Sequence, residues 1–324
     1  MKRFLLRRLL PGLLLFAAAV FLINTNILAP SPAGPPAFVA HRGLGQTFSR
    51  EGLTGETCTA TRMLPPEHAY LENTIAGFEA AFAAGADIVE FDLQPTNDGD
   101  FVVFHDWTLD CRTNGSGETR DHGLAELKAL DIGYGYTADG GKTFPFRGTG
   151  VGLMPTLDEI LDAFPSRRFM INVKSRDPAE GEALAAALAR RNTATLANLF
   201  IYGAREPLDA FTARLAGPKL LSTDNVKRCL LNYFALGWSG YVPEACRQTL
   251  FMLPLNIARW TWGYPHRLSA RLAATGTDVV LLGAYDGSGF SSGIDSREAL
   301  AAVPARFDGS VWTNRIDLIG PAAR

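Results

Sequence analysis

Residues 88–93 constrain the fold more than any other stretch of this chain. Acidic and apolar side chains alternate along them, and residues two apart on a strand point to the same face. Glu90 and Asp92 therefore aim at one place. The opposite face is continuously apolar and consists of Val89, Phe91 and Leu93. A strand with hydrocarbon outside and acids inside is expected where helices cover the outer face of a parallel sheet.

The two inward carboxylates need positive charge beside them, because burying an unpaired charge is very costly. A bound cation or neighbouring Lys and Arg side chains would supply that charge. Carboxylate oxygens suit Mg²⁺ or Ca²⁺ rather than zinc. Glu90 and Asp92 therefore predict a site for one divalent cation, and the alternative is a buried salt-bridge pair.

Strands and helices alternate along the chain. Eight runs are typical of strands: 38–41, 87–93, 169–174, 199–203, 219–222, 250–255, 278–283 and 310–313. Helical stretches lie between several of them, at 73–84, 179–190 and 266–274. This order is typical of a parallel sheet, and eight strands favour closure into a (β/α)8 TIM-type barrel. The alternative is an open doubly wound sheet, but no Gly-rich dinucleotide turn follows a strand.

Three further segments depart from a plain barrel. Residues 101–105 follow the turn at 97–99 too closely for a crossover helix, so they are expected to fold back as a hairpin. Segments 44–71 and 131–154 are too long for ordinary connections and are expected over the carboxyl-end face of the barrel. The second is rich in glycine and aromatic residues, and predicts either a lid or a packed surface loop.

The N-terminal segment, residues 1–29, is expected to direct export. An apolar stretch at 9–23 follows four basic residues, Lys2, Arg3, Arg7 and Arg8. Its length is compatible with a membrane anchor and with a cleaved signal peptide. Small residues at Ser31 and Ala33 are the candidate cleavage site, but they lie far beyond the stretch, so we favour an uncleaved anchor. Either way the remainder is expected outside the cytoplasm, in the periplasm or secreted.

The rest of the chain is expected to form a Pro-rich spacer at 30–36 and a barrel domain at 37–324. A net charge of -2 gives no electrostatic footprint for nucleic acid. The sequence makes no prediction about oligomeric state. Four cysteines in an exported chain predict disulfides, and we favour Cys58 with Cys111 and Cys229 with Cys246, since each pair would fix an irregular segment beside a barrel end. The alternative is four buried thiols.

The barrel places several polar groups at one end, because active groups in this fold come from the carboxyl ends of the strands. These groups are His41 at the end of the first strand, Glu90 and Asp92 on the second, His105 on the hairpin, and Asn172 and Lys174 on the third. These side chains come from separate parts of the sequence, and the barrel predicts that they lie close together.

Six short motifs together resemble those of the glycerophosphodiester phosphodiesterases, distant kin of the sphingomyelinase D toxins. They are His41-Arg42-Gly43, Glu72-Asn73-Thr74, Glu90-Phe91-Asp92, residues 96–99, His105-Asp106 and Val311-Trp312-Thr313-Asn314. Each is weak alone, but the set is specific and spans about residues 38–316. The resemblance implies a TIM barrel with one Ca²⁺ or Mg²⁺ held by Glu90 and Asp92.

The resemblance further implies hydrolysis of glycerophosphodiesters to an alcohol and glycerol phosphate, with His41 and His105 as the acid/base pair. Which histidine is the base, and whether water or the substrate's own hydroxyl attacks, stay open. Arg42 and Lys174 are expected to hold phosphate oxygens. Two acids are expected to act indirectly. Asp106 either orients His105 or caps a turn, and Glu72 either supports the ligands of the bound ion or begins a helix.

One position departs from the family pattern. The third metal carboxylate usually stands two residues before the strand lysine, and here that residue is Asn172. An amide oxygen binds a hard cation but brings no charge, so we expect weaker metal binding, more water ligands or a shifted ion. Two other functions therefore stay open: a lysophospholipase D-like enzyme acting on membrane lipids, and an inactive barrel that serves as a binding module.

Overall fold

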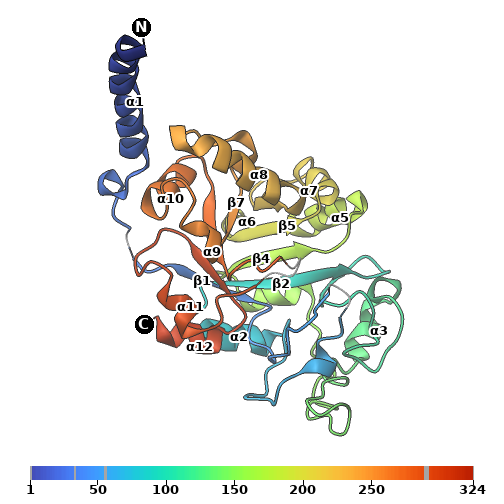
Figure 1. Ribbon diagram of the computed structural model, residues 1–324. Coiled ribbons are helices and arrows are strands. Elements are labelled where there is room, and N and C mark those ends of the chain that lie inside the picture. The colour runs from blue at the N-terminus through green and yellow to red at the C-terminus, as the bar shows by residue number, and fades with distance from the viewer. Residues whose placement is uncertain (1, 33, 55–56, 288–291, 324) are drawn as a thin grey trace.

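Eight parallel strands form the centre of the molecule in the order β6-β5-β4-β2-β1-β9-β8-β7, and β3 pairs antiparallel with β2 (Figure 1). The computed structural model describes residues 2–32, 34–54, 57–287 and 292–323. The strands are β1 Ala37–His41, β2 Ile88–Pro95, β3 Phe101–Val103, β4 Arg168–Val173, β5 Leu199–Gly203, β6 Lys219–Ser222, β7 Leu250–Pro254, β8 Asp278–Leu282 and β9 Ser310–Thr313. At the two ends of this order, Thr249 beside β7 donates a hydrogen bond to the Leu220 carbonyl of β6 at 2.8 Å. The barrel is therefore nearly closed, and the predicted TIM-type fold and its hairpin are confirmed.

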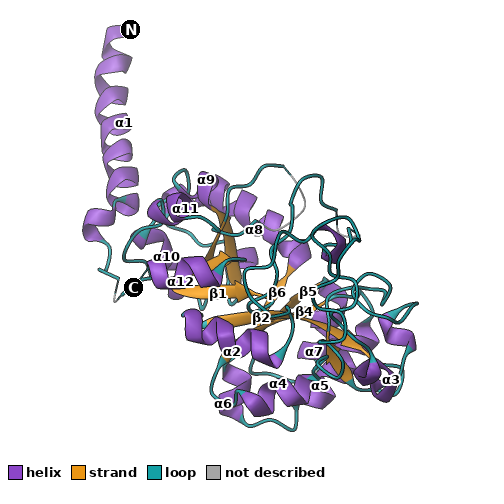
Figure 2. Cartoon of the chain, turned by 90° about the horizontal axis from the view of Figure 1, so that it is seen from below, coloured by secondary structure: helices purple, strands orange, loops and turns teal. Residues whose placement is uncertain are grey.

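Helices surround the strands on the outside (Figure 2). They are α1 Lys2–Asn24, α2 Ile75–Ala84, α3 Leu124–Ala129, α4 Leu157–Ala163, α5 Pro178–Leu188, α6 Thr193–Ala197, α7 Arg205–Thr212, α8 Thr223–Leu236, α9 Leu255–Ala258, α10 His266–Ala273, α11 Arg297–Ala301 and α12 Ile316–Ala322. Short 3₁₀ helices are η1 Asn26–Leu28, η2 Ala60–Arg62, η3 Thr119–Asp121, η4 Gly237–Ser239 and η5 Glu244–Cys246. The outward side chains of β2 and β4 pack against α2, where Phe78 contacts the rings of Phe91 and Phe169.

The inward side chains of the strands form two layers. The lower layer is apolar and consists of Val39, Ile88, Met170, Phe200, Leu221, Leu250, Val280 and Trp312. Two residues further along four of these strands stand His41, Glu90, Asn172 and Tyr202. Because the side-chain period of a strand is two, these polar groups share the inward direction of the apolar layer. The apolar layer fills the barrel nearer the amino ends of the strands, and the polar layer lies nearer their carboxyl ends.

Several boundaries differ from the sequence predictions by one or two residues, and two of them bear on the site. The helix expected from residue 73 begins at Ile75, because Asn73 has a left-handed φ of 57° and Thr74 caps the helix by accepting from the Gly77 N–H at 3.0 Å. Strand β4 ends at Val173, so Lys174 follows the strand rather than ending it.

The two long segments pack on each other beside the carboxyl ends and build a second apolar core. Its buried members include Met63, Leu71, Leu109, Tyr136, Phe146 and Met154. Asp131 closes the loop at 131–154 by accepting from the N–H groups of Gly133, Gly148 and Gly150. Of the two predicted alternatives for this loop, the structure matches the packed surface loop.

Both predicted disulfide pairs are present in the structure. Cys58 joins Cys111 and so links the segment at 44–71 to the loop after the hairpin, while Cys229 joins Cys246 between α8 and η5. The favoured pairing is thus the one observed.

The N-terminal residues form α1, which extends from the barrel at one side (Figure 1). No helix within the described residues meets the length and hydropathy needed to cross a membrane. Ala33, a candidate cleavage residue in the Pro-rich spacer, lies outside the described residues, as do the side chains of Lys2, Arg3, Arg7 and Arg8. The export segment and the division at residues 29 and 36 stay predictions.

Candidate active site

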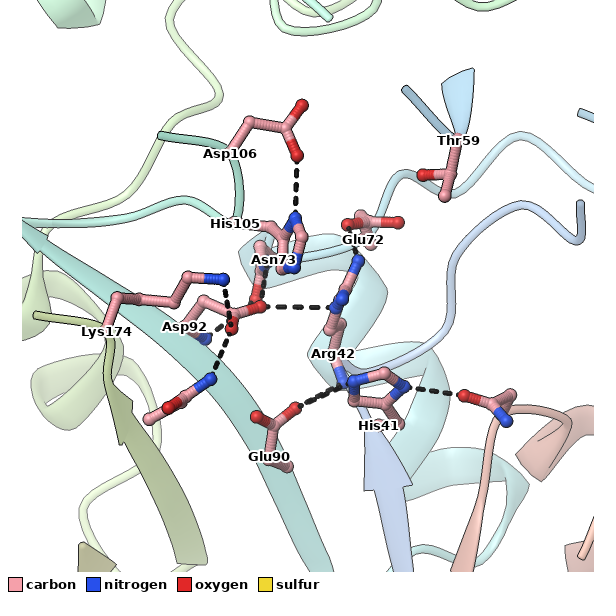
Figure 3. A network of polar contacts seen from close by, with 12 residues as sticks. His41, Arg42, Thr59, Glu72, Asn73, Glu90, Asp92, His105, Asp106 and Lys174 are labelled. Atoms are coloured by element: carbon pink, nitrogen blue, oxygen red, sulfur yellow. Dashed lines mark hydrogen bonds and ion pairs between the residues drawn. The ribbon is translucent and has the colours of Figure 1, made fainter. Parts of the chain in front are cut away.

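The polar groups predicted from separate parts of the sequence meet at the carboxyl ends of the strands (Figure 3). Strand register brings His41 level with Glu90 and Asp92 level with Asn172. The loop after β3 adds His105. The structure therefore places all the predicted site residues in one cluster, while their catalytic and binding roles stay predictions.

Arg42 connects three carboxylates because its backbone takes an unusual conformation. Its φ of 58° lies in the left-handed region, where a non-glycine residue is strained. Its N–H donates to Glu90 Oε2 at 3.1 Å, while its guanidinium donates to Glu72 at 2.9 Å and lies 3.2 Å from Asp92 Oδ2. Only Gly43 fits next, since its φ is 75° and a Cβ would lie 2.5 Å from the Phe78 ring.

Asp92 is the most heavily paired acid of the site. It accepts from the side-chain amides of Asn172 at 2.9 Å and Asn73 at 3.3 Å, and it lies 3.7 Å from Lys174 Nζ. Burial alone would raise the pKa of Asp92, but His105, Arg42 and Lys174 hold it well below its usual range. Asp92 is therefore ionised and carries a full charge in a buried setting.

Glu90 has fewer positively charged neighbours than Asp92. It is fully buried, and its contacts are the Arg42 N–H, the Tyr202 hydroxyl, which donates to Oε1 at 2.5 Å, and His41 Nε2 at 3.8 Å. Burial and the neighbouring Asp92 raise the pKa of Glu90 well above that of an ordinary carboxyl group. The Glu90–Asp92 pair therefore has less cationic charge around it than its two carboxylates need.

His41 is held as a neutral imidazole with a defined tautomer. The Asn314 amide donates to Asp295 at 2.7 Å, so its Oδ1 faces His41 Nδ1 at 2.6 Å as an acceptor. The Nδ1 atom must then carry the proton, which leaves Nε2 free beside Glu90. Burial, followed by the charge of Arg42, lowers the pKa of His41 to about 3.

His105 has a charged acceptor instead of an amide. Its Nδ1 donates to Asp106 Oδ1 at 2.6 Å, and Arg112 Nε donates to the other Asp106 oxygen at 2.9 Å. Burial and the charge of Arg42 lower the pKa of His105, while Asp92 and Asp106 act in the opposite direction. Burial alone would raise the pKa of Asp106, but Arg112 and His105 hold it below its usual range.

Arg112 joins this site to the second core. Its guanidinium also donates to Tyr136 Oη and Thr59 Oγ1 and lies 3.3 Å from Glu72 Oε2. The Cys58–Cys111 disulfide lies directly beside it, since Thr59 follows Cys58 and Arg112 follows Cys111. Position 112 thus ties Glu72 and Asp106 to the packed loops.

Sequence reasoning missed Arg112, Tyr202, Asn73, Asn314 and Asp295 as members of the site. Tyr202 and Asn314 had a usable signal, because each stands two residues after an apolar inward position near a strand end. Asn73 and Asn314 lay within the resembling motifs without an assigned role. Arg112 and Asp295 had no such signal, since only loop folding brings them to the site.

The donor chemistry of the site fits a hard divalent cation. Glu90 and Asp92 offer carboxylate oxygens, Asn172 offers an amide oxygen when its amide is turned, and the raised pKa of Glu90 marks a deficit of positive charge. Within the described residues, however, no group of three or more His, Cys, Asp or Glu side chains stands ready to hold a metal ion. The third ligand must therefore come from an amide, water or substrate.

A cavity of about 210 Å³ opens beside His41 and Arg42. Its wall includes Gln46, Phe48 and Leu64 from the long segment after β1, and Asn314 and Arg315 after β9. The cavity therefore leaves space for a small ligand beside His41.

The fold and this cluster define a TIM-barrel protein with its polar site at the carboxyl ends of the strands. Residues 41–194 match the model of the glycerophosphoryl diester phosphodiesterase family. Residues 41–194 are therefore similar to this family, and the resemblance that the motifs predicted is confirmed.

Curated relatives agree with the family match. A glycerophosphodiester phosphodiesterase of Bacillus subtilis (strain 168) is 41% identical over 125 residues, which is 37% of this chain and 41% of that protein. One from Caldanaerobacter subterraneus subsp. tengcongensis is 42% identical over 103 residues, or 32% of this chain and 39% of that protein. The chain thus spans about two fifths of the length of these relatives.

Solved structures share the fold over most of the chain. The glycerophosphoryl diester phosphodiesterase domain of an uncharacterized Mycobacterium tuberculosis protein has a TM-score of 0.60 at 19% identity and covers 89% of this chain and 98% of its own. An Oleispira antarctica phosphodiesterase in complex with the product sn-glycerol-3-phosphate has a TM-score of 0.52 at 19% identity and covers 89% of this chain and 96% of its own. At these identities the similarity establishes the fold.

Proposed function

We propose that this protein hydrolyses glycerophosphodiesters to an alcohol and glycerol phosphate by acid/base catalysis with two histidines. One observation carries the proposal: His41 and His105 each have Nδ1 fixed by a separate acceptor, and both rings are turned toward Asp92 and Arg42 (Figure 3). Two imidazole edges facing one charged space suit the paired proton transfers of phosphodiester cleavage.

The different acceptors support a division of roles. His41 is neutral with Nε2 unprotonated, so it takes the proton from the attacking hydroxyl as the oxygen–phosphorus bond forms. His105 has a carboxylate behind it, which stabilises the protonated ring, so His105 gives its proton to the departing alcohol oxygen as that phosphorus–oxygen bond breaks. The attacking group is water or the glycerol 2-hydroxyl.

The charged side chains then serve the phosphate. Lys174 is half-buried beside Asp92 and is free to bind a phosphate oxygen as a point charge. Arg42 is already committed to Glu72, Glu90 and Asp92, so its main contribution is to hold these acids in place. Glu90, Asp92 and the oxygen of Asn172 would hold one Ca²⁺ or Mg²⁺, which would neutralise phosphate charge when bound.

Turnover of glycerophosphocholine and of lysophosphatidylcholine tests the proposal. Glycerol phosphate release is followed with a phosphomonoesterase, with Ca²⁺ or Mg²⁺ and with chelator. We expect turnover of glycerophosphocholine that chelator suppresses. Preferred turnover of lysophosphatidylcholine would instead indicate the lipid-directed enzyme, and no turnover of either with added metal would indicate the inactive binding module.

Variants of the histidines test the roles. His41→Gln and His105→Gln are each expected to lower kcat by about 10²- to 10⁴-fold, because each removes one positioned proton transfer. His122→Gln is the matched control, since His122 pairs with Glu126 away from the site. Equal activity of His41→Gln and His122→Gln would remove His41 from the mechanism. ³¹P NMR of the first product separates attack by water from attack by the 2-hydroxyl, which gives a cyclic phosphate.

A further inference from the structure

The end of α1 is fixed to the barrel by a dense set of hydrogen bonds. Arg271 of α10 donates to the Ile23 carbonyl and to Asn24 Oδ1, and Arg267 donates to the Ile23 carbonyl at 3.2 Å. Asn24 in turn donates to the Trp238 carbonyl at 2.7 Å. Two guanidinium groups at a helix C-terminus satisfy carbonyls that have no partner within the helix and oppose the helix dipole.

The residues after α1 continue this attachment. Asn26 donates to the Tyr264 carbonyl at 2.7 Å, and its Oδ1 accepts from the N–H groups of His266 and Arg267. Partners on both sides of residue 25 therefore hold α1 in one orientation. A flexible tether would not need them, and cleavage at Ser31 would remove every one of these contacts.

Exposed apolar side chains surround this junction. On α1 they are Leu10, Leu13, Leu14, Leu15, Phe16, Phe21 and Leu22, and on the barrel they are Leu231, Leu236, Trp238 and Tyr241. We call these eleven side chains the junction patch. The Phe16 and Trp238 rings lie 5.4 Å apart, so its two parts are continuous.

The chemistry of the junction patch is that of a membrane interface. Helix α1 exposes several leucines, and Trp238 and Tyr241 lie beside its end. In membrane proteins, Trp and Tyr rings are enriched at the membrane–water interface. An apolar surface of this size on an exposed helix marks an interaction site.

The patch lies at the opposite end of the barrel from the catalytic groups. Helix α8 starts directly after β6, at the carboxyl end of that strand, and runs back, so Trp238 and Tyr241 lie at the amino ends of the strands. Figure 1 shows α1 on one side of the molecule and the loops of the two long segments on the other. His41 and His105 are on the side of those loops.

We propose that α1 remains on the mature protein, that the junction patch lies against a lipid bilayer, and that the active site faces away from that bilayer. This orientation adds a substrate class to the proposed function, and that addition rests on the proposed function. Lipids of the same bilayer cannot reach a site that faces away from it, so the substrates are water-soluble phosphodiesters.

Fluorescence of the full-length protein in vesicles of phosphatidylcholine with anionic phosphatidylglycerol tests the orientation. Lipids brominated on the acyl chains quench tryptophan that lies at the bilayer. We expect Trp238→Phe to remove most of the quenching. Trp107→Phe is the matched control, because Trp107 is partly exposed and lies two residues after His105, at the catalytic end. It is expected to leave the quenching unchanged.

Each other outcome overturns the proposal. Loss of quenching in Trp107→Phe alone would indicate that the active site faces the bilayer, and no quenching in the wild type would show that α1 does not contact lipid. A patch that holds a second copy instead would give a dimer in detergent that Trp238→Phe weakens. Terminal sequencing of the exported protein must find α1 present. None of these readouts uses catalysis, so they fail independently of the proposed function.

Discussion

His41 and His105 show how the partner of a ring sets its chemistry. An amide oxygen holds His41 and a carboxylate holds His105, although both histidines were predicted from similar short motifs. The amide leaves the ring neutral, and the carboxylate stabilises a proton on it. The proposed division of acid and base roles, which the sequence left open, therefore depends on Asn314 and Asp106.

Asn172 is the residue most specific to this chain. Asn172→Glu is expected to tighten Ca²⁺ or Mg²⁺ binding by about tenfold, because it adds a third carboxylate to Glu90 and Asp92. Isothermal titration calorimetry measures the change, and Asn172→Gln, which keeps an amide, is the control. Unchanged or weaker affinity in Asn172→Glu would remove position 172 from the metal site.

Arg112 neutralises two acids at once. Arg112→Met is expected to lower the free energy of unfolding by about 3 kcal/mol, because it removes a buried cation that both Glu72 and Asp106 contact and leaves each acid with one remaining partner, Arg42 or His105. Arg112→Lys keeps the charge and is expected to lose less. Urea unfolding compares the variants, and equal stability of Arg112→Met and the wild type would contradict the role given to this side chain.

The position of a residue is easier to predict the closer the residue lies to a regular strand or helix. Glu90 and Asp92 were correctly placed together because a strand has a fixed period of two. Arg112 was not predicted as part of the site, since its position depends on how two loops fold against each other. A buried arginine within a loop leaves no periodic signal.

Among the elements, the two loops around Cys58 and Cys111 matter most for the site. Their disulfide closes a span of 53 residues and stands beside Arg112, whereas Cys229–Cys246 closes only 17 on another side of the barrel. One bond therefore supports the His105 loop, and the other joins α8 to η5.

Removing each disulfide separates these effects. The Cys58→Ser, Cys111→Ser double variant is expected to lose about 4 kcal/mol of stability and also activity, while the Cys229→Ser, Cys246→Ser variant is expected to lose about 3 kcal/mol and keep its kcat. Thermal unfolding and glycerophosphocholine turnover measure both. Equal kcat in the two double variants would show that the first disulfide does not position His105.

Elements were predicted well where hydrophobic pattern and turn chemistry agreed. Strands at 199–203, 219–222 and 310–313 match β5, β6 and β9 at both ends. Helix α2 starts later than expected because Asn73 turns its side chain to Asp92 instead of continuing the helix. A residue used by the site overrode the local preference there.

At the level of the whole protein, the excess negative charge at Glu90 and Asp92 makes stability depend on pH. The pKa of Glu90 is raised in the folded state, so its contribution is fully present below about 4.3, the pKa of an unfolded glutamate, and is lost as pH rises. Asp92 and Asp106 have lowered pKa values, so they act in the opposite direction and only at more acidic pH.

Glu90→Gln isolates this effect. In the presence of chelator, the wild type is expected to lose stability relative to Glu90→Gln as pH rises from about 5 to about 8, with up to about 1.4 kcal/mol for each unit of pH. Urea unfolding at several pH values gives the difference. A constant difference between the two proteins over this range would contradict a raised pKa at Glu90.

The sequence by itself determined the alternation of strands and helices, the inward direction of the acids and the family resemblance, because periodicity and short motifs are local properties of the chain. Tertiary packing determined which acceptor each histidine faces, how Arg112 joins two acids, and where α1 sits relative to the catalytic end. These depend on contacts between segments far apart in the chain, and the energies that select such contacts exist only after the barrel has brought the segments together.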